Sequence, residues 1–593
     1  MSSKRNKYHS TQKKYNTRLF LLSAVLGTLV IILIGWLYSI QIKQHNIFIQ
    51  EAKAVQETKK DIQPKRGIIY FQDKEANLVP VAINKNYKLI YAVPETIQKE
   101  NKIADTAKTL ATLLNLDYNN LVTKLSKKND LYEVIAQKID DEEKVKQIQS
   151  LNLKGIYISE ENSRYYPLND LGCHIIGFVG ETKQSEGKKE GLYGLEKYYN
   201  DVLEGKKGVF YGVRDARGRL VRSLFSNEEV VADGSSLITT IDKNIQYKIE
   251  EELANLIETR QGVSGSIIVM EARTGKILGL ANWPKYNLNN YSQVKDYSVF
   301  KNLAIEDAVE IGSVMKILTM AAGLDSHAIT PQTTYIDKGY VTIDKKTIKN
   351  FRNEVYGEAT MTKVLEKSIN TGAVFAEQQT GHKIFLDYLK KFRMDELTGI
   401  DLPFEARGDL SNLERKDTRD IYFATASFGH GILVTPIALL RAYSTVANGG
   451  VLVNPYVTEA VISPGGKREE TPKDETNERI ISEETAKALT DMMVKVVEEG
   501  YGSRAKIKGY LFAGKTGTAN IASFGGYSED TIQSFVGFFP AYNPRFAILV
   551  KLDKPKIGDA ASATVTLSFR NVAQFLINYY NIPPDEFTAS KAS

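Results

Sequence analysis

The chain has 593 residues, of which 42% are hydrophobic and 25% charged, a composition typical of globular protein with room for several buried cores. Its formal net charge is +6, but residues 1–18 alone contain six lysines and arginines and no acid, so the remainder is close to neutral. This distribution excludes a nucleic-acid-binding body, because such domains need a basic face to supply their affinity.

An uncharged stretch follows the basic tail. Residues 19–42 contain no charged side chain, and about 24 residues at 1.5 Å each span the roughly 30 Å of bilayer hydrocarbon. We predict a transmembrane helix at 19–42, with residues 1–18 as a cytoplasmic tail and the rest of the chain outside the membrane. A cleaved signal peptide is the alternative. It would have an apolar region of about 7–15 residues and a small-residue cleavage site, and WLYSIQIK offers no clear one.

The next region, 43–240, is predicted to be an α+β module. Residues 43–61 are polar and helix-forming, and extended structure is expected from IIYF onward. Helices are predicted at 95–128 and near 139–150, and mixed strands and glycine turns from 164 to 240. Cys173 is the single cysteine, so no internal disulfide can form, and it is expected to be a small core residue.

The sequence pattern changes near residue 242. A helix is expected there, followed by a β-hairpin in GSIIVMEARTGKILGLA, in which RTGK is a hairpin turn. Further helices are predicted at 313–326, 361–379, 435–448 and 482–499, and three strands in GYLFAGKTGTANI, TIQSFVGFFP and RFAILVKL. Strands at both ends of the region predict one antiparallel sheet built from distant segments and covered by helices, with a helical subdomain. We expect 463–479 to be a solvated loop and 583–593 a flexible tail.

A serine and a lysine mark the start of one apolar helix. Ser-x-x-Lys occurs six times in the chain, but Ser313 alone opens an apolar run, EIGSVMKILTMAAGL. Residues three apart share a helix face, so Lys316 is expected beside Ser313 and close to the core. An N-cap serine with a lysine that extends to water is the ordinary alternative. Burial would instead lower the lysine pKa and leave an amine able to take the serine proton.

Two later motifs complete a known pattern. Ser313-Val314-Met315-Lys316, then Ser368-Ile369-Asn370, then Lys515-Thr516-Gly517-Thr518 resemble the SxxK, SxN and KTG motifs of penicillin-recognising serine enzymes, in the same order. The chain is most similar to the class B penicillin-binding proteins, which are monofunctional peptidoglycan transpeptidases. The segments that carry this wider resemblance are PKRGIIY, RYYPLNDLGCHIIGFVG, GLYGLEKYYNDVLEGKKG, TTIDKNIQ, MEARTGKILGLANWPKYNLN, SFGHGILVTPIALLRAYSTVANGG and SFVGFFPAYNP.

The sequence departs from the family pattern at two places. Ile311 stands where the family usually has a proline before the GS of the first motif, and FQDKEAN replaces the usual Asp-Arg-Asn-Gly turn after RGIIY. Neither position supplies a catalytic atom. The resemblance therefore implies a pedestal or dimerisation-like module at 43–240 and a transpeptidase domain at 241–582.

The resemblance also implies a role for each motif residue. The expected catalytic residues are Ser313 as nucleophile, Lys316 as base, Ser368 as a bridge that passes the proton to the leaving amine, and Lys515 as a fixed positive charge. The expected substrate-binding residues are Asn370 for an amide, Thr516 and Thr518 for the terminal carboxylate, and Gly517 for room beside the substrate backbone. The backbone N–H groups of Ser313 and Thr518 would form the oxyanion hole.

On this basis we expect a D,D-transpeptidase that cross-links D-alanyl-D-alanine stem peptides and is inhibited by β-lactams. We expect it to be anchored in the bacterial plasma membrane by a single span. A β-lactamase or penicillin-sensing receptor shares the three motifs, and a non-catalytic membrane scaffold is the alternative from another class. Chain length favours a cell-division over an elongation enzyme, with a membrane glycosyltransferase and divisome or elongasome proteins as partners. No cofactor or metal is expected, because the six histidines are scattered and His430 in FGHGI reads as a turn residue near the cleft.

Overall fold

The computed structural model describes residues 3–48, 57–62, 64–128, 130–182, 189–214, 220–222, 231–472, 477–523 and 526–585. The chain divides into two compact units, Met1–Pro64 with Lys206–Ala232, and Lys65–Gly205 with Asp233–Ser593. The flexible tail predicted at 583–593 lies mostly outside the described residues.

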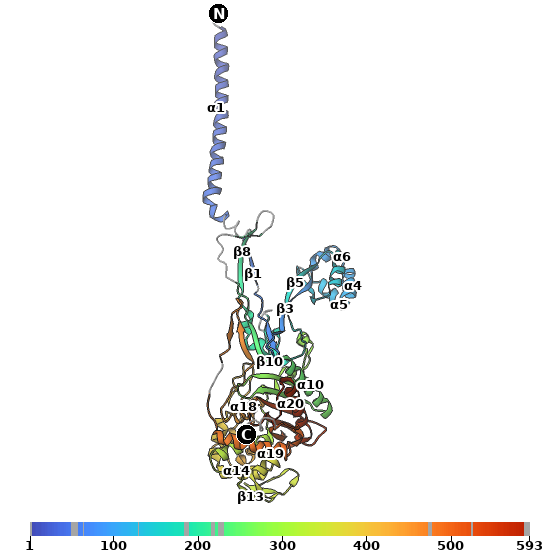
Figure 1. The fold of residues 1–593 in the computed structure, drawn as a ribbon. Helices are drawn as coiled ribbons and strands as arrows, with labels where there is room; N and C mark the ends of the chain where they lie inside the picture. Colours follow the sequence, from blue (N-terminus) through green and yellow to red (C-terminus); the bar gives the residue numbers. More distant parts are fainter. Residues whose placement is uncertain are drawn as a thin grey trace. The chain divides into compact units, whose positions relative to one another are not determined.

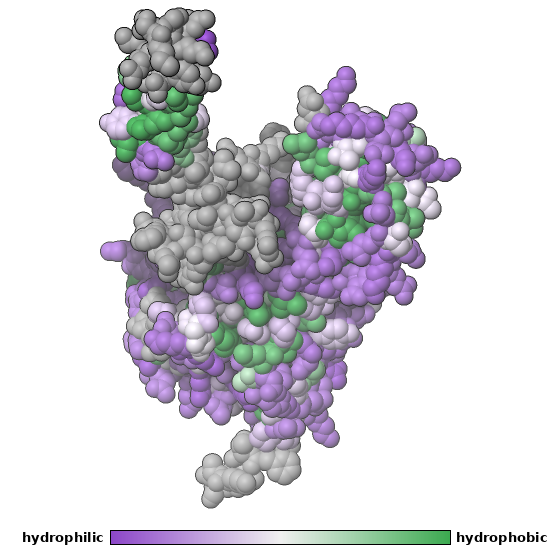
Figure 2. Space-filling view, turned by 90° about the horizontal axis from the view of Figure 1, so that it is seen from above, coloured by the Kyte–Doolittle hydropathy of each residue, from purple (hydrophilic) through white to green (hydrophobic). Residues whose placement is uncertain are grey.

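The first unit contains one long helix and a small sheet. Helix α1 (Ser3–Tyr38) continues into the π-helical turn η1 (Ser39–Lys43), and the apolar span Thr17–Lys43 within them is long enough to cross a membrane. In Figure 2 the coloured part of this helix is mainly green, because its apolar side chains are exposed. This agrees with the predicted membrane helix in length and composition.

The small sheet of this unit corrects one prediction. Strand β1 (Glu57–Ile62) pairs antiparallel with β8 (Gly208–Arg214), which pairs with β9 (Leu220–Arg222). The helix expected over 43–61 is therefore wrong for 57–61. The segment ETKKDI has no strand pattern of its own, and its conformation is set by a partner about 150 residues away in sequence.

The second unit begins with a two-layer lobe, which stands to one side in Figure 1. Its strands are β2 (Ile69–Gln72), β3 (Val79–Ala92), β4 (Glu133–Ile139) and β5 (Ile156–Tyr165), with β3 between β4 and β5. The helices are α3 (Pro94–Lys99), α4 (Ile103–Leu114), α5 (Tyr118–Leu125) and α6 (Glu142–Ser150). Ile90 of β3 packs in one apolar cluster with Leu110 of α4 and Leu121 of α5. The helices predicted here are confirmed, although the first is three separate helices.

The segment from 164 to 240 connects this lobe to the larger domain. Strand β10 (Ser236–Asp242) lies parallel to β2 and antiparallel to β17 (Thr458–Ile462), which pairs with β18 (Arg468–Glu470). The strands expected in HIIGFVG and GLYGLEKYY are largely wrong. Short helices occupy these segments, namely α7 (Cys173–Ile176), α8 (Gly194–Tyr198) and α9 (Asn200–Glu204), beside the short strands β6 (Val179–Glu181) and β7 (Lys189–Gly191). Cys173 is buried, as expected.

One buried ion network holds these segments together. Arg66 and Arg164 each place Nε 2.6 Å from a different carboxylate oxygen of Glu196, whose side chain is fully buried. The pairing compensates the desolvation of the carboxylate, and the two arginines together keep the pKa of Glu196 below its ordinary value although burial alone would raise it. PKRG, RYYPL and GLYGLEKYY are thereby fixed to one another.

The larger domain is built on a five-stranded antiparallel sheet with the order β12-β11-β21-β20-β19. Its strands are β11 (Ser264–Glu271), β12 (Ile277–Trp283), β19 (Ala513–Ser523), β20 (Gly526–Phe539) and β21 (Phe546–Asp553). The hairpin, the three later strands and their assembly from both ends of the region are as predicted. Helices α10 (Lys243–Arg260) and α20 (Val565–Tyr580) cover one face, and α20 was not anticipated.

Alternation along the strands separates the two faces of this sheet. Ile267 and Val550 pack with α10 and α20 in one apolar cluster, whereas their neighbours Ile268 and Leu549 pack in another with α12 (Lys316–Asp325) and α18 (Pro436–Ala447). Successive side chains on a strand point to opposite faces, so each strand contributes to both cores. The apolar helix that begins at Lys316 is therefore held inside the domain.

A helical subdomain completes the fold (Figure 1). Its remaining helices are α13 (Met361–Glu366), α14 (Asn370–Thr380), α15 (His382–Lys391), α16 (Ser411–Glu414), α17 (Asp420–Ala426) and α19 (Glu483–Glu498). Two strand pairs that the sequence analysis did not predict precede them. Strand β13 (Thr334–Asp337) pairs with β16 (Gly357–Thr360), and the hairpin of β14 (Tyr340–Ile343) and β15 (Lys346–Lys349) lies between them in the chain. The single helix predicted at 361–379 is wrong, because the chain breaks at Ser368.

Candidate active site

Ser313 lies in the 3-10 turn η4 (Gly312–Met315), directly before α12. Gly312 has φ +60, and a Cβ at this position would lie 2.8 Å from the carbonyl oxygen of Thr518. Glycine thus provides both the left-handed backbone and the close approach of the turn to strand β19. The turn that carries Ser313 therefore lies against β19, the last strand of the sheet.

Lys316 is fully buried, and its amine is surrounded by oxygen atoms. Its Nζ lies 2.9 Å from Ser313 Oγ, 2.7 Å from Ser368 O and 2.8 Å from Asn370 Oδ1. A neutral amine has two N–H donors for the two carbonyl-type oxygens and one lone pair left for the Ser313 hydroxyl. Burial, and after it the charge of Lys515, lowers the pKa of Lys316 well below that of a free lysine. The structure therefore brings the two predicted residues together, with the amine in contact with the hydroxyl.

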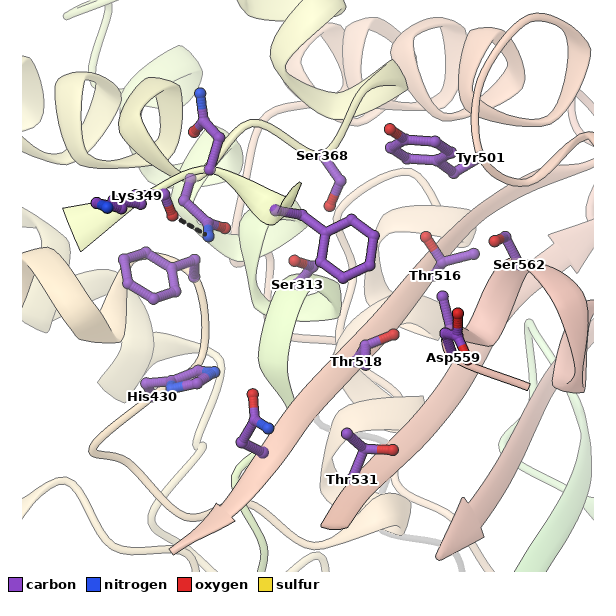
Figure 3. Close-up of a pocket in the computed structure, with 16 residues that line it drawn as sticks. Ser313, Lys349, Ser368, His430, Tyr501, Thr516, Thr518, Thr531, Asp559 and Ser562 are labelled. Atoms are coloured by element: carbon purple, nitrogen blue, oxygen red, sulfur yellow. Dashed lines mark hydrogen bonds between the residues drawn. The ribbon is translucent and has the colours of Figure 1, made fainter. Parts of the chain in front are cut away.

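The break between α13 and α14 carries the second motif. Ser368 has φ +51, an uncommon conformation for a residue with a side chain. Its Oγ lies 3.2 Å from Lys316 Nζ and 2.9 Å from Lys515 Nζ, so one hydroxyl joins the two amines. Asn370 donates through Nδ2 to Lys349 O at 3.0 Å, the dashed line in Figure 3. Both ends of the Asn370 amide are therefore occupied in this structure.

Strand β19 carries the third motif. Lys515 is fully buried, and burial lowers its pKa to about 7. Thr516 and Thr518 line the pocket from one face of the strand (Figure 3). Gly517 lies on the other face, where a Cβ would stand 2.5 Å from Ser534 Oγ and 2.8 Å from Ile311 O. Gly517 thus makes room for the Ser313 segment behind the strand.

One buried aspartate that the sequence analysis missed fixes the pocket wall. Asp337 accepts hydrogen bonds from Thr371 Oγ1 at 2.7 Å, Asn350 Nδ2 at 2.9 Å and the backbone N–H of Tyr356 at 2.8 Å. These donors belong to the segment after the SIN motif and to the loop after β15. Asp337 therefore ties the segment that follows Ser368 to the wall that carries Asn350. Its neighbours in sequence, TYIDKGY, gave no signal of this role.

These side chains open onto one pocket of about 430 Å³. Its lining consists of Ser313, Lys349, Asn350, Phe351, Ser368, Asn370, Phe428, His430, Tyr501, Thr516, Thr518, Asn520, Thr531, Asp559, Ala560 and Ser562. Figure 3 shows Ser313 near the middle, with Ser368 and Thr516 on one side and His430 on another. His430 was expected only to serve a turn near the cleft, and the structure places it in the pocket wall. Among the described residues no cluster of His, Cys, Asp and Glu could hold a metal.

The matches to family descriptions agree with this geometry. Residues 265–574 match the family described as the penicillin binding protein transpeptidase domain, which is more than half of the chain. Residues 61–239 match the penicillin-binding protein dimerisation domain. The chain therefore belongs to the penicillin-binding protein transpeptidases, and the order of its two domains is that of the class B proteins.

Individual relatives extend over most of the chain. Stage V sporulation protein D of Bacillus subtilis (strain 168) is 35% identical over 503 residues, which cover 83% of this chain and 75% of the relative. Peptidoglycan D,D-transpeptidase FtsI of Escherichia coli (strain K12) is 29% identical over 515 residues, which cover 86% and 83%. Both alignments span the N-terminal module as well as the transpeptidase domain.

Solved structures show the same α+β fold. A peptidoglycan synthetase from Bifidobacterium adolescentis superposes with a TM-score of 0.69 at 24% identity, covering 89% of this chain and 98% of the other. Penicillin binding protein 2X from Streptococcus thermophilus has a TM-score of 0.68 at 22% identity, covering 88% and 80%. The predicted fold class is confirmed, because these similarities include both modules.

Proposed function

We propose that this protein is a peptidoglycan D,D-transpeptidase that works through an acyl-enzyme on Ser313. Ser313 Oγ attacks the carbonyl carbon of the penultimate D-alanine of a stem peptide, and the hydroxyl proton passes to the neutral amine of Lys316. The backbone N–H groups of Ser313 and Thr518 stabilise the oxyanion, a contribution of about 2.7–4 kcal/mol for one such donor. The single observation that carries this proposal is the buried amine of Lys316, 2.9 Å from Ser313 Oγ.

The remaining residues deliver the proton and hold the substrate. Ser368 passes the proton from Lys316 toward the leaving amine, and Lys515 keeps positive charge beside the site. The distances of 3.2 Å and 2.9 Å from Ser368 Oγ to the two amines support this route. Thr516 and Thr518 bind the terminal carboxylate, and Asn370 binds an amide after releasing Lys349 O. An amine of a second stem peptide then takes the acyl group and frees Ser313.

The test is the location and lifetime of a penicillin adduct. Mass spectrometry of the digested protein should find the adduct on the peptide that contains Ser313, and Ser313→Ala should abolish labelling while the melting temperature stays unchanged. Lys367→Ala is the matched control, since Lys367 is next to Ser368 but its Nζ contacts Glu499 O outside the pocket. Labelling elsewhere, or persistent labelling of Ser313→Ala, would refute the assignment.

Two other functions remain as alternatives to be separated by the same reagent. A β-lactamase would release the penicillin quickly, whereas a transpeptidase should keep it for many minutes. The match of residues 61–239 to a penicillin-binding protein dimerisation domain favours the transpeptidase, because a lactamase gives that module no role. A scaffold without catalysis would not be labelled at all.

We further propose where the protein works and with what. Residues 1–18 form a cytoplasmic tail and 19–42 a membrane span, which places the module 43–240 and the catalytic domain 241–582 outside the plasma membrane. The basic tail and the uncharged span support this topology. A membrane glycosyltransferase that makes the glycan strand is the expected partner. Chain length and the similarity to FtsI support a septal role, and depletion should then give filaments instead of rounded cells.

A further inference from the structure

The substrate pocket has an end for which the proposed mechanism gives no role. Thr516, Thr518 and Asn520 follow one another along β19 and all line the pocket. If the terminal carboxylate is bound at Thr516, the residues before the scissile bond must leave along β19 toward Asn520. Figure 3 shows His430 on the opposite wall from Thr518 at this exit. The side chain at the exit is therefore placed to contact the upstream part of the acyl donor.

A carboxylate lies directly behind His430. Glu310 accepts hydrogen bonds through Oε1 from the backbone N–H of Gly431 at 2.8 Å and from the Tyr527 hydroxyl at 3.1 Å. Its other oxygen, Oε2, is buried without a hydrogen-bond partner in the described part of the chain and lies 3.9 Å from His430 Nδ1. Only 12% of the Glu310 side chain and 19% of the His430 side chain are exposed.

This arrangement determines which nitrogen of His430 is available. The carboxylate oxygen near Nδ1 favours the tautomer with the proton on Nδ1, so Nε2 keeps its lone pair. The rings of Phe428 and Tyr527, with centroids 5.4 Å and 5.1 Å from that of His430, limit rotation of the imidazole. Burial lowers the pKa of His430 to about 4, so the imidazole is neutral at physiological pH. Nε2 is then a hydrogen-bond acceptor.

We propose that His430, positioned by Glu310, is a specificity-determining residue that binds an ammonium group on the acyl donor, upstream of the scissile bond. This inference rests on the proposed function, since it assumes that a D-alanyl-D-alanine peptide is the donor. The partner chemistry is a primary amine on the residue before the two D-alanines, the residue whose place is taken in a penicillin by the acyl group on the ring amine.

The charge of the site explains why a cation is favoured over a neutral group. Burial raises the pKa of Glu310, which means that its anion lacks a sufficient counter-charge in the free protein. An ammonium group that donates to His430 Nε2 supplies this charge through the imidazole, in the order carboxylate, imidazole, ammonium. Because a hydrogen bond to a charged group contributes about 1.5–3 kcal/mol, the preference should be about tenfold or more.

Three penicillins with one common core test this preference. Benzylpenicillin, ampicillin and N-acetylated ampicillin differ only at the side-chain carbon next to the amide, which carries hydrogen, an ammonium or an acetamide. Second-order acylation constants are measured for each by competition with a fluorescent penicillin. The readout is the ratio of ampicillin to each neutral analogue within one protein, so that a general loss of activity or folding cancels.

The ratio should fall about tenfold in Glu310→Gln, which keeps an oxygen for Gly431 and Tyr527 but removes the charge. It should fall as far in His430→Phe. The matched control is Glu377→Gln. Glu377 forms a similar carboxylate–imidazole pair with His382, with Oε1 2.6 Å from Nδ1, and this pair does not line the pocket. The ratio in this variant should equal that of the native protein.

Two results have separate meanings. If benzylpenicillin does not label the native protein, the proposed function fails. If all three penicillins label and the ratio is the same in native protein, Glu310→Gln and His430→Phe, the inference about His430 is overturned while the transpeptidase assignment stands.

Discussion

Removing the buried amine of Lys316 is the sharpest perturbation of the proposed chemistry. Within the described chain, Lys316 Nζ is the one titratable group recorded at hydrogen-bond distance from Ser313 Oγ, at 2.9 Å. Two of its other contacts, Ser368 O at 2.7 Å and Asn370 Oδ1 at 2.8 Å, use both N–H groups of a neutral amine. A positioned base of this kind contributes about 10²–10⁴ in rate. Lys316→Ala should therefore lower the penicillin acylation constant by about this factor.

The assay is the time course of labelling by a fluorescent penicillin, followed on denaturing gels. Thermal unfolding reports whether the variant still folds, and Lys367→Ala controls for the loss of one positive charge near Ser368. The acylation constant of native protein should rise with pH as Lys316 loses its proton, and Lys316→Ala should lose this rising limb. If folded Lys316→Ala is acylated within about tenfold of the native rate, the amine is not the base and the mechanism built on it is wrong.

Three further changes test how the site is held. The pKa of Lys515 is lowered from 10.5 to about 7, so its buried charge destabilises the folded state below pH 7, and this cost disappears as pH rises toward 10.5. Below pH 7, Lys515→Met should therefore have a free energy of unfolding up to about 5 kcal/mol above that of the native protein. In urea titrations this gain should vanish near pH 10.5. Gly312→Ala should lose about 1–3 kcal/mol in the same titrations and most of its acylation, since its Cβ would meet the Thr518 carbonyl oxygen at 2.8 Å with φ at +60. Asp337→Asn should lose about 1–3 kcal/mol and slow acylation, because an amide N–H group would face the donor of Thr371, and labelling kinetics with unfolding curves would detect both effects.

The fold could be predicted from the sequence where an element determines its own pattern. The hairpin of β11 and β12 has two apolar runs around a turn, and α18 and α19 have clear helical periodicity, so these were found with nearly correct ends. Strand β1 was missed because a polar segment is extended only through its pairing with β8. Strands β13 to β16 were missed because each has four residues, too few for a periodic pattern of apolar residues to appear.

The site could be predicted as far as its chemistry is encoded in short motifs. Ser313 and Lys316 are three residues apart on one turn, so their contact follows from helix geometry. Their contacts with Ser368 and Lys515 came from the family resemblance, since no local pattern relates residues so far apart. Asp337 and Glu310 were missed because an isolated acidic residue belongs to no motif. Its contacts become visible only in the folded chain.

The order of the central sheet also has a consequence for biosynthesis. Ser264 in β11 contacts Asp553 in β21, 289 residues later in the chain. Strand β11 leaves the ribosome long before β21 exists, and until then one of its two edges has no neighbour. Unpaired edges attract other chains, so the emerging polypeptide should depend on chaperones, and truncation between β11 and β21 should yield aggregates instead of a smaller soluble domain.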